Sequence, residues 1–199
     1  MLRDVYSQDV AGLIWKFDEK VYHAPFGVVD TRLNKIVHIT PFSSSGPDSI
    51  AVTPDGSLIY YGMENEPAPW TTGTLDVISA TNYSVVKTIQ FANYPFIYTS
   101  FSPDGKYAYI VETATNGNSN LLTLYTSNYV VSNTISLPPS NSITGVVTAD
   151  GKYIYVPQSA NPGTITVVNT ISHQLVTTIN TNTGGQPEDT TLTPMFNTV

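Results

Sequence analysis

Few side chains in this sequence have the type and spacing of a catalytic or metal-binding group. The three histidines, His23, His38 and His173, fall in strand or turn positions, and none has a second ligand at the spacing of a zinc or calcium site. No serine lies in a Gly-x-Ser-x-Gly turn, and the absence of cysteine excludes a thiolate nucleophile or a disulfide. We therefore expect no catalytic residue, no metal ion and no organic cofactor.

Two groups of carboxylates need an interpretation. Glu64 and Glu66 stand two positions apart in a proline-rich segment, and a carboxylate pair at a set separation can hydrolyse a glycosidic bond. A single loop seldom holds two carboxylates that rigidly, so we expect a solvated loop there. Asp55, Asp104 and Asp150 each precede a glycine, and we expect each to accept hydrogen bonds from the amides of a turn.

These three aspartates belong to an internal repeat that runs through the whole chain. VTPDGSLIYY at residues 52–61 returns as FSPDGKYAYI at 101–110 and as VTADGKYIYV at 147–156. Each copy predicts a β-hairpin, because glycine accepts the positive φ of a tight turn and the flanking aromatic and β-branched residues favour strands.

A second recurring block sets the period of the repeat. It ends at Ile39, Ile89, Ile135 and Ile179, which lie 50, 46 and 44 residues apart. With four short strands in each period, here named A to D, this spacing predicts the blades of a β-propeller. Adjacent apolar pairs indicate strands covered on both faces, as stacked blades require: Val28-Val29, Val85-Val86, Val130-Val131, Val146-Val147 and Val167-Val168. Asp30, Asp76 and Asn169 lie around the third strand. They are expected to cap backbone groups at its end or to accept hydrogen bonds within it.

The fold class predicted is therefore all-β, a small propeller of four-stranded antiparallel blades with about four blade equivalents in one domain. Three full blades are expected at 46–92, 95–138 and 141–182. A composite closing blade would join residues 20–39, with strand B at 20–24, to the strand at 187–194, which would hide the exposed edges. Alternatively, residues 10–17 form a degenerate strand A, and the C-terminal strand pairs with a neighbouring molecule or belongs to a larger propeller.

The order of these motifs resembles the YVTN-type β-propeller repeat of surface-layer and cell-surface proteins. The best copy runs from Asp150 to Ile179, where YIYVP replaces the Tyr-Val-Thr-Asn pattern. The resemblance covers residues 20–194 and implies the fold and a place at the cell surface, but little chemistry, since one fold serves many functions.

Composition narrows the choice of partner. The net charge is −7 with only 8 lysines and arginines, so neither nucleic acid nor an anionic membrane surface is expected to bind. No stretch is long and apolar enough to insert into a membrane or to act as a signal peptide. The low content of charged residues favours an extracellular or cell-surface protein whose signal peptide is absent from these 199 residues.

The connections predict where a partner binds. The A–B and C–D turns are nearly uniform, whereas the B–C loops and D–A crossings differ in every blade, and rigid folds place recognition on variable loops. We expect a binding or structural module, not an enzyme, that contacts a glycan or protein through Glu64, Glu66, Trp70, Tyr94 and Phe96. The alternatives are that these aromatics only pin the loops, or that the chain is a hydrolase or lactonase-like propeller enzyme.

Overall fold

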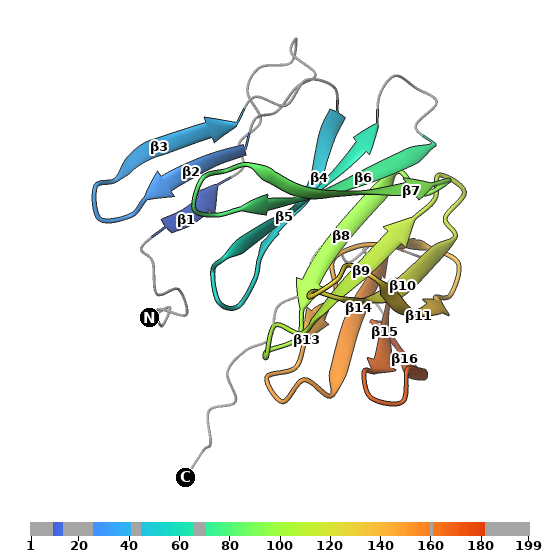
Figure 1. Ribbon diagram of the computed structural model, residues 1–199. Helices are drawn as coiled ribbons and strands as arrows, with labels where there is room; N and C mark the ends of the chain where they lie inside the picture. Colours follow the sequence, from blue (N-terminus) through green and yellow to red (C-terminus); the bar gives the residue numbers. More distant parts are fainter. Residues whose placement is uncertain (1–9, 14–25, 41–44, 66–70, 160, 182–199) are drawn as a thin grey trace. The chain divides into compact units, whose positions relative to one another are not determined.

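The computed structural model describes residues 10–13, 26–40, 45–65, 71–159 and 161–181. Within these residues it consists of strands and turns and contains no helix (Figure 1). The chain divides into two compact units, residues 1–99 with 114–116, and residues 100–113 with 117–199.

The first unit holds two antiparallel sheets and the start of a third. One sheet has the order β1-β2-β3 and the other the order β4-β5-β6-β7, so consecutive strands are neighbours throughout. The strands are β1 (Val10–Leu13), β2 (Phe26–Asp30), β3 (Lys35–Thr40), β4 (Ser45–Val52), β5 (Leu58–Asn65), β6 (Thr72–Ser79) and β7 (Val85–Ala92). β8 (Phe96–Phe101) begins in this unit and ends in the other.

The second unit completes the sheet β8-β9-β10-β11 and adds a fourth sheet. Its strands are β9 (Tyr107–Thr113), β10 (Ser119–Tyr125), β11 (Val131–Ser136), β12 (Asn141–Ser142), β13 (Val146–Val147), β14 (Tyr153–Ser159), β15 (Thr164–Asn169) and β16 (Gln174–Asn180). The innermost strand of the fourth sheet is interrupted, since β12 and β13 both pair with β14. At Gly145, between them, a methyl group would lie 2.8 Å from the end of the Ile154 side chain, so a larger residue there requires that side chain to shift.

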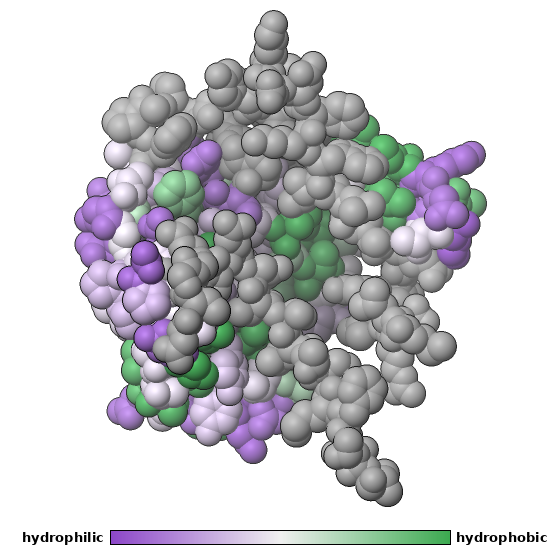
Figure 2. Space-filling view, turned by 180° about the vertical axis from the view of Figure 1, so that it is seen from behind, coloured by the Kyte–Doolittle hydropathy of each residue, from purple (hydrophilic) through white to green (hydrophobic). Residues whose placement is uncertain are grey.

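The sheets confirm an all-β fold built from antiparallel, mainly four-stranded sheets. Strands at positions B and C are buried on both faces: every residue of β9 after Tyr107 is buried, and so are six of the eight residues of β6. The expectation that all adjacent apolar pairs are covered is wrong for the outermost strands. Val85-Val86 and Val130-Val131 lie at exposed positions, with Val86 53% exposed, because none of the described strands pairs with the outer side of β7 or β11. Exposed apolar groups beside hydrophilic ones are visible at the surface in Figure 2.

The A–B turns share one hydrogen-bond pattern. In the turn after β8, the Gly105 amide donates to the Ser102 carbonyl, and Gly105 has a φ of 71°. Asp104 Oδ1 accepts bonds from Ser102 Oγ at 2.7 Å and from the Lys106 amide at 3.1 Å. The same bonds recur at Asp55 and Asp150, which confirms that these carboxylates hold turn amides.

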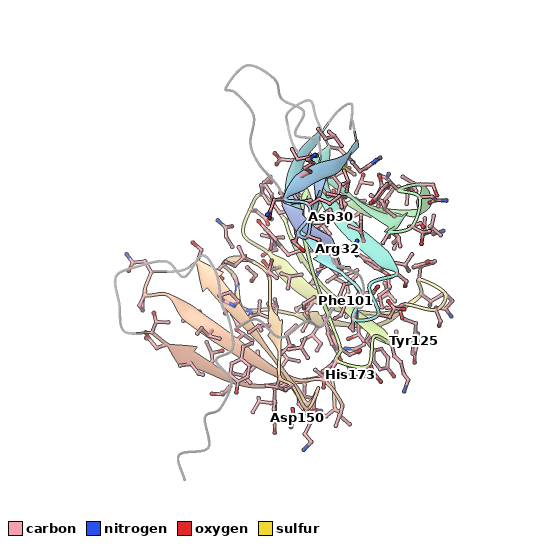
Figure 3. The ribbon with its side chains drawn as sticks, turned by 90° about the vertical axis from the view of Figure 1, so that its left-hand side faces the viewer. Asp30, Arg32, Phe101, Tyr125, Asp150 and His173 are labelled. Carbon is pink, nitrogen blue, oxygen red and sulfur yellow. The ribbon has the colours of Figure 1, made fainter. Side chains whose placement is uncertain are left out.

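The C–D turns also repeat, with a residue in the left-handed region in every sheet. Asp30 Oδ1 accepts bonds from the amides of Arg32 and Leu33, and the Arg32 side chain lies beside it (Figure 3). Asn169 caps its turn in the same way, and Asp76 Oδ1 accepts a 2.6 Å bond from Thr88 Oγ1, so the roles expected of all three are confirmed. The left-handed residues are Asn34, Tyr83, Tyr129 and His173.

The first sheet differs in part from the expected arrangement. β1 at Val10–Leu13 pairs with β2, the position for which the sequence suggested residues 20–24. Residues 20–24 and 187–194 lie outside the described residues, so the composite closing blade stays a prediction.

Candidate functional site

Three of the five predicted binding residues lie among the described residues, at one end of the sheet β4–β7. Glu64 lies near the end of β5 and faces Gly73 across the β5–β6 ladder, while Tyr94 lies in the crossing from β7 to β8 and Phe96 at the start of β8, and both are half-buried. Glu66 and Trp70 are outside the described residues. The structure therefore brings at least Glu64 and the segment 94–96 to the same end of this sheet.

Two glycines allow the crossing segment to pack directly on the sheet. A methyl group at Gly62 would lie 2.3 Å from the Ile97 carbonyl oxygen, and one at Gly73 would lie 2.6 Å from the Tyr94 carbonyl oxygen. Both distances are far below van der Waals contact, so only glycine permits this approach. Residues 94–97 consequently rest on the backbones of β5 and β6.

Two neighbouring side chains of β4 hold the same segment by hydrogen bonds. The Ile97 amide donates to Asp48 Oδ2 at 3.1 Å, and Ser49 Oγ donates to the Ile97 carbonyl at 2.7 Å. The β4–β5 register shifts between Pro47 and Ser49, so Asp48 is an extra residue at a bulge. Both polar backbone groups of Ile97 are thus bound by β4.

Asp48 has an unusual proton affinity. Burial raises the pKa of its carboxyl to about 7, the Ile97 hydrogen bond opposes this shift, and the charge of Glu64 adds to it. Burial, with the Asp48 charge as a smaller cause, raises the pKa of Tyr61 to about 12, and the same two effects together with Glu64 raise the pKa of Tyr98 to about 12. A carboxyl that changes charge near neutral pH, beside a second acid, is a frequent property of functional sites.

The sequence interpretation missed Asp48, although the repeat contains a signal. Counting back from the turn residues Thr53, Ser102 and Thr148, the position of Asp48 is occupied by Ile97 and Ile143 in the next two repeats. Packing favours an apolar side chain at this position, whereas Asp48 carries a carboxyl group. This difference makes Asp48 a candidate functional residue.

A separate cavity of about 420 Å³ lies at the turn end of the strands in the second unit. The buried Tyr109 and Thr123 are among its lining residues, and turn residues of both sheets of the unit contribute to its wall. Asp150 and His173 both lie at this end of the strands (Figure 3). The remaining lining residues are Ser102, Pro103, Asp104, Tyr107, Ala149, Gly151, Thr170 and Ile171.

The histidines have different surroundings. The His38 ring stacks on Tyr83 with the centroids 3.9 Å apart, whereas His173 lines the cavity, and His23 is outside the described residues. Among the residues that the structure describes, no three histidine or acidic side chains form a group able to hold a metal ion. In the same residues no helix is long and apolar enough to cross a membrane.

Comparison with known proteins supports the fold. No family model matches the sequence, and no curated protein matches it either. Among solved structures, the chain is similar to the Kuenenia stuttgartiensis hydrazine synthase, with a TM-score of 0.63, 16% identity, and coverage of 79% of this chain and 58% of that one. It is also similar to the dihydro-heme d1 dehydrogenase NirN in complex with DHE, with a TM-score of 0.58, 16% identity, and coverage of 87% and 38%.

Both of these proteins are β-propellers, and the likeness supports a propeller fold for this chain. At 16% identity it shows the fold alone. The chain matches little more than half the length of the first structure and about two fifths of the second.

Proposed function

We propose that this chain is a non-enzymatic binding or structural module of an extracellular or cell-surface protein, and that it recognises a glycan or protein through its variable connections. The observation that carries this proposal is the rigid support of the segment 94–97. Its backbone is fixed by Asp48 and Ser49 and rests on Gly62 and Gly73.

A rigid support favours recognition because little conformational entropy is lost on binding. Tyr94 and Phe96 keep part of their surface exposed, and Glu64 lies at the same end of the sheet. Aromatic side chains on a fixed backbone are frequent energetic centres of interfaces, and a nearby acid adds polar selectivity.

The test is to replace Tyr94, Phe96 and Trp70 with alanine, one at a time. Binding to a glycan array, or to isolated cell envelopes in a sedimentation assay, should be lost while the melting temperature stays nearly unchanged. Tyr129→Asn is the matched control: it removes an aromatic ring from a C–D turn, and asparagine tolerates the left-handed backbone there. Collapse of the fold in the alanine variants, or protection of the Asp-Gly turns by the partner, would contradict the assignment.

The finer architecture belongs to the same proposal. The chain is a YVTN-type repeat protein of about four blade equivalents, and residues 187–194 add the innermost strand to the sheet of β2 and β3. The supporting observation is the repeated pattern of turns in all four described sheets. The alternative is that the C-terminal strand pairs with a neighbouring molecule or continues a larger propeller.

One observation favours a second candidate, a hydrolase. General acid–base catalysis works best with a pKa near the working pH, and the Asp48 carboxyl, at about 7 beside Glu64, meets that condition. Hydrolysis of p-nitrophenyl glycosides or of simple lactones by the parent, lost in Asp48→Asn, would establish it. The binding module is preferred because Asp48 is engaged in holding the Ile97 amide.

A further inference from the structure

The cavity in the second unit has the composition of a ligand site of its own. Its volume of about 420 Å³ falls within the range of roughly 300 to 1,000 Å³ typical of small-molecule pockets. It is lined by residues of the A–B and C–D turns and of β9 and β10, and not by the variable connections of the proposed function, so either site can exist without the other.

The charges at its rim are balanced. Hydrogen bonds from Ser102 and from the Lys106 amide lower the pKa of Asp104 to about 2, and equivalent bonds lower the pKa of Asp150. Both carboxylates are therefore ionised at neutral pH, but each has a lysine of its own turn beside it. Lys106 Nζ lies 3.1 Å from Asp104 Oδ2, and Lys152 Nζ lies 3.4 Å from Asp150 Oδ2. A charged ligand gains little net attraction at such a rim.

The two carboxylates still have capacity for a ligand. A carboxylate accepts about four hydrogen bonds. The described contacts of Asp104 use three, from Ser102 Oγ, the Lys106 amide and Lys106 Nζ. Asp150 accepts the three equivalent bonds, from Thr148 Oγ1, the Lys152 amide and Lys152 Nζ. Each can accept a further bond, which a ligand hydroxyl would donate.

Two tyrosines are among the residues that line the cavity. Tyr107 and Tyr109 lie in its wall with ring centroids 6.5 Å apart, and the Tyr107 ring is 5.4 Å from that of Tyr125, which is partly exposed. Flat apolar rings next to fixed hydrogen-bond acceptors match a sugar ring, which has C–H groups on its face and hydroxyls at its edge.

Ala149 is one of the residues that line the cavity. The equivalent turn positions in the two preceding repeats are Pro54 and Pro103, and Pro103 lines the same cavity. Its side chain is exposed, and the position after Thr148 is the first central residue of the turn, which accepts most residue types. A larger residue can be placed there without disturbing the fold.

We propose that this cavity binds a neutral sugar unit. The sugar ring lies against Tyr107, which is half-buried, and its hydroxyls donate to Asp104 and Asp150. Balanced charge, free acceptor capacity and apolar ring faces together select a neutral polyhydroxylated ligand over an acidic or cationic one.

The experiment uses the full chain with glucose, galactose, mannose and N-acetylglucosamine as neutral probes, and galacturonic acid and glucosamine as charged ones. Binding is followed by calorimetry and by NMR of the tyrosine and histidine rings. At least one neutral sugar should bind better than both charged sugars and shift the signals of Tyr107 and His173. Ala149→Trp should weaken that binding at least about tenfold, and Pro54→Trp, which places the same side chain at the equivalent turn position of a repeat outside the cavity, should leave it unchanged.

Several results would overturn the proposal: no neutral sugar binds, a charged sugar binds better, or Ala149→Trp binds as the parent does. The NMR signals and the comparison of neutral with charged sugars are read on the unmodified protein, so these two results do not depend on how well either variant folds. Loss of partner binding in the Tyr94 or Phe96 variants leaves this test unaffected, so the two proposals fail separately.

Discussion

Replacing Asp48 with asparagine should make the protein more stable at neutral and alkaline pH. The pKa of Asp48 is raised from 3.8 to about 7 by folding. Above pH 4 the unfolded chain loses this proton, while the folded protein keeps it until about pH 7. The contribution of Asp48 to the free energy of unfolding is therefore complete below pH 4 and is lost as the pH rises to 7.

The size of the effect follows from the shift. About three pH units at about 1.4 kcal/mol each correspond to about 4 kcal/mol between pH 4 and 8. The asparagine of the Asp48→Asn variant does not titrate, and its side-chain oxygen can still accept the Ile97 hydrogen bond. The difference in unfolding free energy between this variant and the parent should therefore grow with pH across this window. Urea unfolding at pH 4, 5, 6, 7 and 8 measures it.

Acids with lowered pKa values do not disturb this measurement. Asp104, with a pKa of about 2, contributes stability that is lost only as the pH falls below 4, and it does so in parent and variant alike. Glu64→Gln is the matched control: it removes a neighbouring charge and should reduce the pH dependence without abolishing it. A difference between Asp48→Asn and parent that stays constant to within about 0.5 kcal/mol from pH 4 to 8 would refute the reasoning.

Three further predictions concern stability. Gly62→Ala should cost several kcal/mol or prevent folding, because its methyl group would strike the Ile97 carbonyl; Gly56→Ala, which meets no atom but has a φ of 72°, should cost only about 1 kcal/mol in urea unfolding. Gln158→Leu should cost about 2 to 4 kcal/mol by thermal unfolding, because the fully buried amide donates to the Pro138 carbonyl and accepts bonds from Thr164 and Thr166. Deleting residues 187–199 should cause aggregation or unfolding if they close the first sheet; a monomer as stable as the parent in light scattering and melting would contradict this.

Local chemistry made much of the fold predictable. The hairpins follow from the Asp-Gly turns, and the four-stranded sheets follow from the period of the closing isoleucines. The exposure of Val85-Val86 was not predictable from the apolar pairs, because burial depends on whether a further strand lies outside β7. The break between β12 and β13 depends in the same way on pairing with a neighbouring strand, β14, which the sequence of this segment does not show.

The candidate sites were harder to predict for the same reason. The cavity joins Asp104 to Asp150 and His173, residues that are far apart in the sequence and that the repeat presents as ordinary turn positions. Glu64 and Tyr94 were chosen as variable-loop residues, but the groups that hold that region, Gly62 and Asp48, are on strands. A sequence pattern locates a strand more readily than it locates the neighbours of a strand.

Each candidate site contains a residue whose type differs from that of the equivalent residues in other repeats. In a repeat of stacked sheets, packing demands the same residue types at equivalent positions, so a departure that packing does not explain requires another cause. Asp48 occupies a position where the next two repeats have isoleucine, and it titrates near neutral pH. Ala149 occupies a position where the two preceding repeats have proline, and it lines the cavity. Both residues lie on the strand or turn that begins a repeat. The residue types in this part of each repeat can therefore vary, while the buried B and C strands preserve the fold.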